Sequence, residues 1–356
     1  MNLRPQPHHN AISLAKAVGI LLMVLGHAHG PFFIRCWMVM FHMPLFFFLS
    51  GYCFKENYLT HCQEFILRRV KGLYIPFVKW SIVFLLLHNV FCDLGWYNGQ
   101  EVGYFDLRTF CTTFVRCFFM NYKDWTLGAF WFIRQLLYAS ILSLFAIKYL
   151  KNLKAIILLS IAIAISFAYF DFRIRGLDFN KTTFSGVAFF VSGYAFRQLG
   201  IAPTWKWIVG GFAITCLGSI FWRTSILTTS AVELAPYYVS GVAGSVMTLF
   251  SCQFFEQRKS KKGLSMLYYI GNHTMEILAL HFISFRLFTY IAIRMENLPF
   301  VHMGDFPVLT VGKIWYWIPY FIVGTCIPIL YCLAKDRITN SRNQFHTAAP
   351  SVPSKS

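Results

Sequence analysis

Two residues that could do chemistry in an apolar environment, Lys16 and His27, stand at the two ends of one apolar run, KAVGILLMVLGH. At about 100° per residue they are three helical turns plus roughly 20° apart, so both side chains lie on one face of a helix. Their separation along the helix axis is roughly 16 Å. An ammonium group can bind an anion, and a neutral imidazole can act as a general base or a nucleophile. The alternative is a structural role, in which Lys16 extends to the lipid headgroups and His27 lies at the outer membrane–water interface.

A second polar stretch, FHMPLFFFLSGY at 41–52, places His42 and Ser50 among apolar residues. Pro44 removes a backbone donor and predicts a kink close to His42. Gly51 has no side chain, which favours the close approach of another backbone. A structural kink explains the proline and the glycine, but it explains His42 less well.

Three further ionisable side chains fall within apolar stretches: Arg134 in WFIRQLLY, and Glu276 and His281 in GNHTMEILALH. An ionisable group at the centre of a membrane helix costs about 2.5–3.5 kcal/mol or more. Arg134 therefore needs an acidic partner or an anionic ligand. We expect Glu276 to lie at a depth similar to that of Lys16, and a pair between them would neutralise both.

The elements that must position these residues are membrane helices. The chain of 356 residues is 57% hydrophobic and only 13% charged, with 39 phenylalanines, whereas about a quarter of the residues of a soluble protein are charged. We predict an all-α integral membrane protein with about ten transmembrane helices. The predicted spans are 12–30, 35–54, 73–92, 127–147, 154–170, 182–200, 207–222, 235–255, 268–291 and 313–333.

The distribution of lysine and arginine predicts that both termini are cytoplasmic. With that orientation most basic residues, including the cluster Arg68, Arg69 and Lys71, lie on the cytoplasmic side. Residues 1–335 are expected to form one transmembrane domain, and residues 336–356 a polar, disordered cytoplasmic tail. The net charge of +18 then largely reflects topology. Nucleic-acid binding is not expected, because the basic residues are scattered over several loops.

The predicted outer loops carry three other features. The stretch 106–119 has apolar residues at helical spacing, which predicts an amphipathic helix on the outer surface. The polar loop 171–181 could bind sugar or could be only a connection. Cys92, Cys111 and Cys117 lie close enough in sequence for a disulfide, which remains open. The ten cysteines include no Cys-x-x-Cys pair, so no metal site is expected.

Together these stretches resemble the membrane-bound acyltransferase family 3, and most closely its fucose 4-O-acetylase-like branch of O-acyltransferases. The resemblance covers about residues 10–335. Its most specific parts are the basic residue followed after ten others by histidine, Lys16 to His27, and the His-x-Pro-x-x-Phe-x-x-Ser-Gly run from His42 to Gly51. Many family members have arginine where this chain has Lys16, and lysine keeps the charge but loses bidentate phosphate binding.

The resemblance implies an enzyme of the bacterial cytoplasmic (inner) membrane that moves an acyl group, most often acetyl, from cytoplasmic acyl-CoA to a sugar hydroxyl of a cell-envelope or exported glycan. It implies acyl-CoA and a glycan or glycolipid as partners in the lipid bilayer, with no bound cofactor and no metal. The residues it suggests fall into three groups: His27, His42 and Ser50 for catalysis, with His27 as general base or transient acyl carrier; Lys16, Arg68, Arg69 and Lys71 for acyl-CoA; and Arg134, Glu276 and His281 as further candidates.

Two other classes of protein stay open from the residues alone. A transporter or flippase for an anionic lipid-linked sugar could use Lys16 and Arg134 along its path, although the sequence has no inverted repeat. A haem b electron carrier could use His27, His42 or His281 as axial ligands.

Overall fold

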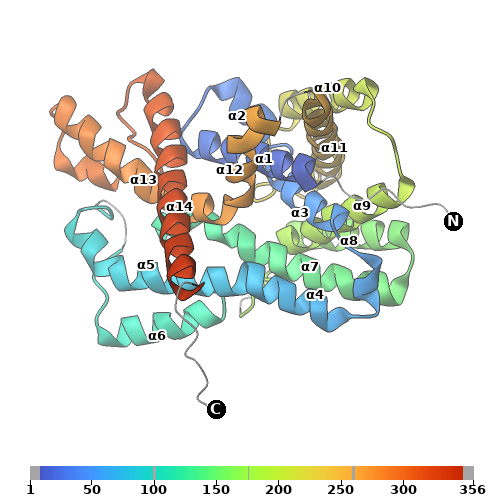
Figure 1. Cartoon of the computed structure of the whole chain (residues 1–356), viewed down its shortest axis with the longest axis horizontal. Helices are drawn as coiled ribbons and strands as arrows, with labels where there is room; N and C mark the ends of the chain where they lie inside the picture. The colour runs from blue at the N-terminus through green and yellow to red at the C-terminus, as the bar shows by residue number, and fades with distance from the viewer. Residues whose placement is uncertain (1–8, 99–101, 175, 259–260, 348–356) are drawn as a thin grey trace, which may run out of the picture.

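The computed structural model describes residues 9–98, 102–174, 176–258 and 261–347, and these are helical throughout apart from loops and one isolated β-bridge, Ile174 with Phe179. The α-helices, shown in Figure 1, are α1 His9–His27, α2 Phe32–Met38, α3 His42–Tyr52, α4 Cys62–Arg69, α5 Ile75–Asp93, α6 Leu107–Phe118, α7 Trp131–Leu150, α8 Leu153–Tyr169, α9 Lys181–Leu199, α10 Trp205–Phe221, α11 Leu234–Arg258, α12 Ser265–Asn272, α13 Thr274–Met295 and α14 Trp317–Thr347. Shorter helical turns are η1 Glu56–Leu59, η2 Val70–Tyr74, η3 Trp125–Phe130, η4 Lys261–Leu264, η5 Phe300–Gly304 and η6 Ile314–Tyr316.

Seven helical segments of the described residues are long and apolar enough to cross a membrane. They are Asn10–His27, Phe32–Tyr52, Cys62–Asp93, Trp125–Leu150, Leu234–Arg258, Thr274–Met295 and Ile314–Asn340. The predicted all-α membrane fold is therefore confirmed. The other three predicted spans are also helices, but α8 and α10 have only 17 residues each and α9 is not among the seven. The total of about ten spans and the cytoplasmic position of the termini remain predictions.

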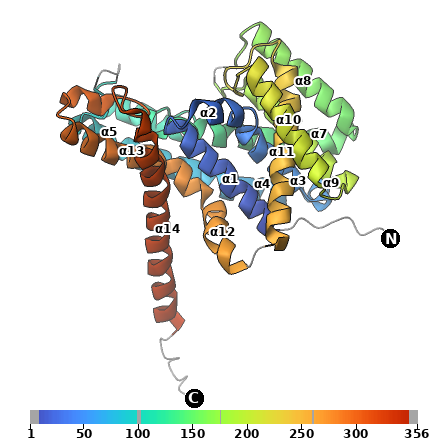
Figure 2. The same cartoon turned by 90° about the horizontal axis from the view of Figure 1, so that it is seen from above.

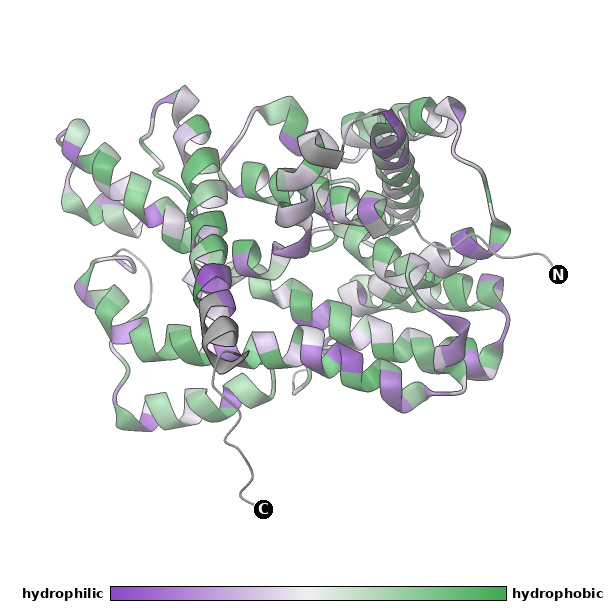
Figure 3. Cartoon of the chain, in the orientation of Figure 1, coloured by the Kyte–Doolittle hydropathy of each residue, from purple (hydrophilic) through white to green (hydrophobic). Residues whose placement is uncertain are grey.

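Several helices pack against the helix that follows them in the sequence. Figure 1 shows α5 beside α6, α10 beside α11, and α13 beside α14, and contacts between Cα atoms agree with each pairing. Seen from above in Figure 2, α14 extends away from the other helices and carries the C-terminal end. Figure 3 shows apolar residues along most helices and polar residues gathered at α4 and in α14 just before the stretch drawn in grey.

Helices α3 and α9 approach each other closely because two glycines leave room for backbone. A Cβ atom on Gly51 of α3 would overlap the carbonyl oxygen of Phe190 in α9, and one on Gly193 of α9 would overlap the carbonyl oxygen of Phe48. The predicted role of Gly51 is confirmed. The contact fixes α3, and with it Ser50 and His42, against the centre of the protein.

The second predicted span is interrupted at residues 39–41, between α2 and α3. Pro44 lies in the first turn of α3, where its missing N–H group leaves no helical hydrogen bond unmade. His42 is the first residue of α3, and its Nδ1 atom lies 2.9 Å from the carbonyl oxygen of Met38. The break thus turns the His42 ring back across the gap towards α2.

Helix α14 corrects the expectation for the C-terminal tail. The sequence predicted disorder from residue 336, but α14 continues to Thr347. The stretch after Asp336 contains neither glycine nor proline before Pro350, so nothing in the local sequence stops the helix. Residues 348–356 lie outside the described residues.

The expected pair between Lys16 and Glu276 does not form. Glu276 accepts a hydrogen bond of 2.9 Å from Lys335 of α14 instead. The next residue, Asp336, accepts one of 2.7 Å from the hydroxyl of Tyr269 in α12. The charge of Glu276 therefore ties α13 to α14 and leaves Lys16 free to face a cavity.

Candidate active site

Three cavities adjoin one another through the helix bundle, and most of the candidate residues line one of them. The first contains Lys16 and has a volume of about 360 Å³. The second contains His27 and has a volume of about 260 Å³. The third contains Asp124 and has a volume of about 690 Å³. We refer to them as the Lys16 cavity, the His27 cavity and the Asp124 cavity.

The Lys16 cavity combines two cations with apolar walls. Lys16 of α1 and Arg69, the last residue of α4, both line it, together with Ser50 of α3 and side chains of α7 and α13. The Arg69 guanidinium lies 4.7 Å from the centre of the Phe65 ring, which holds it in place. The Oγ atom of Ser50 is buried and has no hydrogen-bond partner among the described residues, so it can donate to a ligand.

Two of the basic residues suggested for the donor lie outside this cavity. Arg68 is exposed and forms an ion pair of 3.0 Å with Glu64, one turn before it in α4. Lys71 is exposed in η2 and does not line the cavity. Successive helical residues point about 100° apart, so only Arg69 of the three faces inward.

His27 and His42 line the same cavity. They come from the end of α1 and the start of α3, and Met23, Met38 and Trp131 are among the other lining residues. A carbonyl oxygen can only accept, so Nδ1 of His42 must donate to Met38. In the neutral ring the Nε2 atom of His42 then carries the lone pair.

A third histidine, His281 of α13, lies behind His27. The two ring centres are 5.4 Å apart. His281 is fully buried, and its Nδ1 atom is 3.0 Å from the carbonyl oxygen of Leu278, to which it must donate. Its Nε2 atom is buried with no hydrogen-bond partner among the described residues. His281 thus contacts the His27 ring without lining the cavity.

Arg35 of α2 also lines the His27 cavity, although no sequence motif had singled it out. Its Nε atom is buried and has no hydrogen-bond partner in the described part of the chain. A buried guanidinium N–H without an acceptor is costly. A group that becomes negative in the cavity would supply the missing acceptor.

The three cavities share their walls. Met23, Met43 and Leu278 line both the Lys16 cavity and the His27 cavity. Trp131 and Leu227 line both the His27 cavity and the Asp124 cavity. The histidines are therefore reached from a cationic cavity on one side and from a polar, aromatic cavity on the other.

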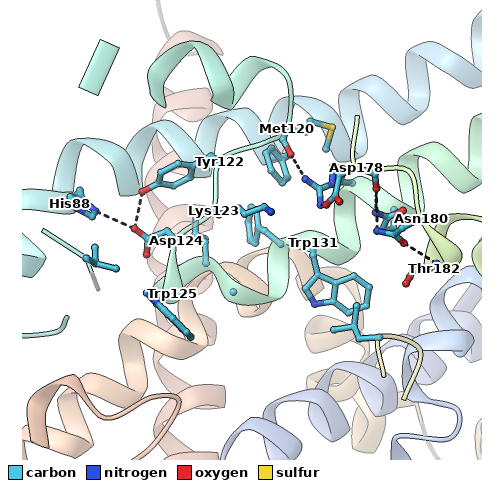
Figure 4. A pocket seen from close by; sticks show the side chains of 18 of the residues that line it. His88, Met120, Tyr122, Lys123, Asp124, Trp125, Trp131, Asp178, Asn180 and Thr182 are labelled. Carbon is cyan, nitrogen blue, oxygen red and sulfur yellow. Dashed lines mark hydrogen bonds and ion pairs between the residues drawn. The ribbon is translucent and has the colours of Figure 1, made fainter. Parts of the chain in front are cut away.

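The Asp124 cavity, drawn in Figure 4, has a buried carboxylate at one end. Asp124 accepts hydrogen bonds from the hydroxyls of Tyr97, at 2.8 Å, and Tyr122, at 2.9 Å, and from the backbone N–H of Thr126. Its Oδ2 atom is also 3.4 Å from Nδ1 of His88. Burial raises the pKa of Asp124, but the hydrogen bonds from His88, Thr126 and Tyr97 outweigh it and hold the pKa below the usual value.

At the other end of this cavity Arg134 has the acidic partner that its position demanded. Its Nη2 atom is paired with Asp178, and its Nη1 atom donates to the carbonyl oxygen of Met120 at 3.0 Å. Asp178 also forms an ion pair of 3.2 Å with Arg173. Both residues belong to the loop 171–181, so one of the two readings of that loop, that it lines a binding site, has structural support.

The remaining residues singled out from the sequence do not form a further functional site in the described residues. Glu276 lies outside all three cavities and pairs with Lys335. Cys92, Cys111 and Cys117 are free thiols. In the described residues no group of three or more His, Cys, Asp or Glu side chains could hold a metal ion.

Comparison with known proteins identifies the family. No curated protein and no solved structure matches the chain. Residues 9–333 match the family model of acyltransferase family 3, described as an acyltransferase domain. The match includes all three cavities and favours an enzyme over the transporter that the residues alone left open. The chain belongs to acyltransferase family 3 and is a multi-pass membrane acyltransferase.

Proposed function

We propose that the protein transfers an acetyl group from acetyl-CoA to a sugar hydroxyl of a cell-envelope or exported glycan in a bacterial cytoplasmic membrane, as expected for the fucose 4-O-acetylase-like branch. One observation carries the proposal. The cavity with His27 and His42 lies between a cationic cavity and a polar, aromatic one and shares walls with both.

The donor occupies the Lys16 cavity. Coenzyme A carries several phosphate charges, which suit the ammonium of Lys16 and the guanidinium of Arg69. The apolar walls from α7 and α13 suit the thin pantetheine arm. The roughly 16 Å between Lys16 and His27 along α1 has the same order of length as that arm, so the thioester reaches the His27 cavity.

The acceptor occupies the Asp124 cavity. Its volume of about 690 Å³ lies within the range typical of ligand sites. Trp125 and Trp131 offer aromatic faces. The amide groups of Gln135 and Asn180 also line the cavity, and hydrogen bonds within the protein hold them in place. Flat aromatic rings with hydrogen-bonding side chains between them suit a sugar ring, whose faces are apolar and whose rim carries hydroxyls.

The reaction takes place in the His27 cavity, which lies between the donor cavity and the acceptor cavity. His27 takes the proton of the acceptor hydroxyl as its oxygen forms a bond to the thioester carbonyl carbon. The Nε–H of Arg35 stabilises the oxyanion that develops on the carbonyl oxygen. The carbon–sulfur bond then breaks, and the coenzyme A thiolate leaves with the proton that His27 returns. His42 and Ser50 orient these groups.

The test uses purified protein in lipid nanodiscs with acetyl-CoA labelled in the acetyl group. We expect label to move to a bacterial membrane glycan extract with the wild type and not with His27→Ala, while both proteins bind acetyl-CoA equally. Labelled protein trapped in the absence of acceptor would show an acyl-histidine intermediate in place of direct transfer. A wild-type protein that neither binds nor consumes acetyl-CoA would refute the proposal.

A further inference from the structure

The charges of the Asp124 cavity point to the class of acceptor, an inference that rests on the function proposed above. The cavity is lined by three permanent cations, Lys123, Arg134 and Arg173, and by two carboxylates, Asp124 and Asp178. A cavity for a neutral sugar has no need of a surplus of positive charge. Which of these charges remain available to a ligand decides what the cavity can bind.

Both carboxylates are buried and have partners within the protein. Asp124 accepts from two tyrosine hydroxyls and from Thr126, and its side chain is only 2% exposed. Asp178 is shared by Arg134 and Arg173, and its side chain is 9% exposed. Neither carboxylate has a free face for a cation of the ligand, so the cavity is not built to bind positive groups.

Two cations remain available. Lys123 is exposed and has no hydrogen bond or ion pair within the described residues; in Figure 4 it lies between the Asp124 cluster and the Asp178 cluster. Arg173 uses Nε to bind Asp178, and its side chain is 55% exposed. The two terminal nitrogens of a guanidinium can bind two oxygens of a carboxylate or phosphate together.

Arg134 has a different role in the same cluster. It is buried, and it is held by Asp178 and by the carbonyl oxygen of Met120. Asp178 carries one negative charge and is paired with two arginines, so it cannot neutralise both Arg134 and Arg173. Two arginines on one aspartate leave one positive charge at this end of the cavity. With Lys123 and Asp124 included, the three cations still exceed the two carboxylates by one charge.

We propose that the Asp124 cavity selects a sugar acceptor that carries an anionic group, a carboxylate or a phosphate, and that Lys123 and Arg173 bind that group. Lys123 and Arg173 are specificity-determining residues in this assignment. They hold the anion while the tryptophan faces hold the ring, and the acceptor hydroxyl then points towards the wall shared with the His27 cavity.

The test measures binding of three small probes to the full chain in nanodiscs of neutral lipid at low salt. They are p-nitrophenyl glucuronide, with a carboxylate; glucose 6-phosphate, with a phosphate; and p-nitrophenyl glucoside, which is neutral. We expect at least one anionic probe to bind about tenfold more tightly than the neutral one, with the preference weakened by added salt. The probe that binds more tightly distinguishes the carboxylate from the phosphate.

The variants are Lys123→Gln, Arg173→Gln and their combination, with Arg108→Gln as a control for loss of an exposed charge outside the cavity. Each single variant should reduce the anionic preference several-fold, the double variant should abolish it, and the control should keep it. Equal binding of all three probes, no binding of any, or a preference that survives the double variant would overturn the proposal.

Binding of acetyl-CoA to the same samples separates this inference from the proposed function. If acetyl-CoA binds and the anionic preference is absent, the acetyltransferase proposal stands and the acceptor class is wrong. If the preference is present and follows Lys123 and Arg173 but acetyl-CoA does not bind, the anionic site is supported and the donor assignment is refuted.

Discussion

His27 and His281 lie with their ring centres 5.4 Å apart, although they come from the first and the thirteenth helix of the chain. The Nδ1–H of His281 donates to a backbone carbonyl, so its Nε2 lone pair is the side of the ring that remains free. We expect this lone pair to favour the tautomer of His27 whose N–H faces His281, which would leave the other ring nitrogen to take a proton from an acceptor hydroxyl.

We expect His281→Leu to lower kcat by about tenfold to 100-fold without changing the dissociation constant of acetyl-CoA, because the loss acts through the tautomer of His27. Steady-state kinetics with direct donor binding measure both quantities. A purely structural role would instead weaken donor binding and lower the melting temperature along with kcat.

Arg35 provides a sharper test of the proposed transition state. Removing one oxyanion donor typically costs 10²–10³-fold in kcat, so Arg35→Gln should show a loss of about that size with little change in KM for acetyl-CoA. Arg223→Gln is the matched control, since Arg223 is exposed and does not line the His27 cavity. A KM effect without a kcat effect would place Arg35 in donor binding.

The neighbouring residues Arg68 and Arg69 separate the donor site from the general positive charge of this region. Only Arg69 lines the Lys16 cavity, whereas Arg68 is exposed and paired with Glu64. Arg69→Gln and Lys16→Gln should each weaken acetyl-CoA binding about tenfold or more, and Arg68→Gln should leave it within about twofold because exposed ion pairs contribute little. Equilibrium dialysis with labelled acetyl-CoA measures this, and equal losses for both arginines would contradict the assignment.

Gly51 tests the packing that holds α3 in place. Gly51→Ala drives a methyl group into the carbonyl oxygen of Phe190, and overpacking of this kind costs about 1–3 kcal/mol. Gly72→Ala is the control, because a Cβ atom there meets nothing within 4 Å. Thermal unfolding in detergent should show a lower melting temperature for the first variant alone.

Because of Asp124, we expect the stability of the folded protein to depend on pH in the acid range. Its pKa is lowered in the folded protein, so the folded state binds fewer protons than the unfolded state. The stabilisation is present above the unfolded pKa of about 4 and is lost as the pH falls through the lower, folded pKa. Asp124→Asn should lower the melting temperature at pH 7 and flatten its fall below about pH 4. Asp171→Asn, at an exposed carboxylate, should do neither.

The sequence was sufficient to predict the helices, but it predicted only part of the candidate active site. Hydropathy placed every predicted span on helical segments, although the spans 35–54 and 268–291 each cover two helices separated by a break. Helical spacing put Lys16 and His27 on one face because that relation is local. The Arg134–Asp178 pair joins α7 to a loop that is distant in sequence, so the need for an acid was predictable and its identity was not. Asp124 lies outside the predicted spans, and Arg35 is the first residue of the predicted span 35–54. No motif in either segment distinguishes these two residues from ordinary residues near a helix end.

The partner of Glu276 could not be predicted from the sequence for the same reason. Its depth in α13 resembled that of Lys16, but its neighbour is set by how α14 packs. No periodicity in either segment encodes that contact. Pairwise contacts between helices far apart in sequence follow from the packing of the whole bundle, whereas helix faces and breaks follow from a few adjacent residues.

The wall between the Lys16 and His27 cavities also bears on the timing of turnover. Two of its three shared side chains are methionines, Met23 and Met43, which are unbranched and can change rotamer without moving the backbone. Rotamer changes are faster by orders of magnitude than sliding or hinging of helices. A thioester arm can therefore advance or withdraw between the two cavities while the helices stay fixed, so the arrival of the acyl group need not wait for a rearrangement of the protein.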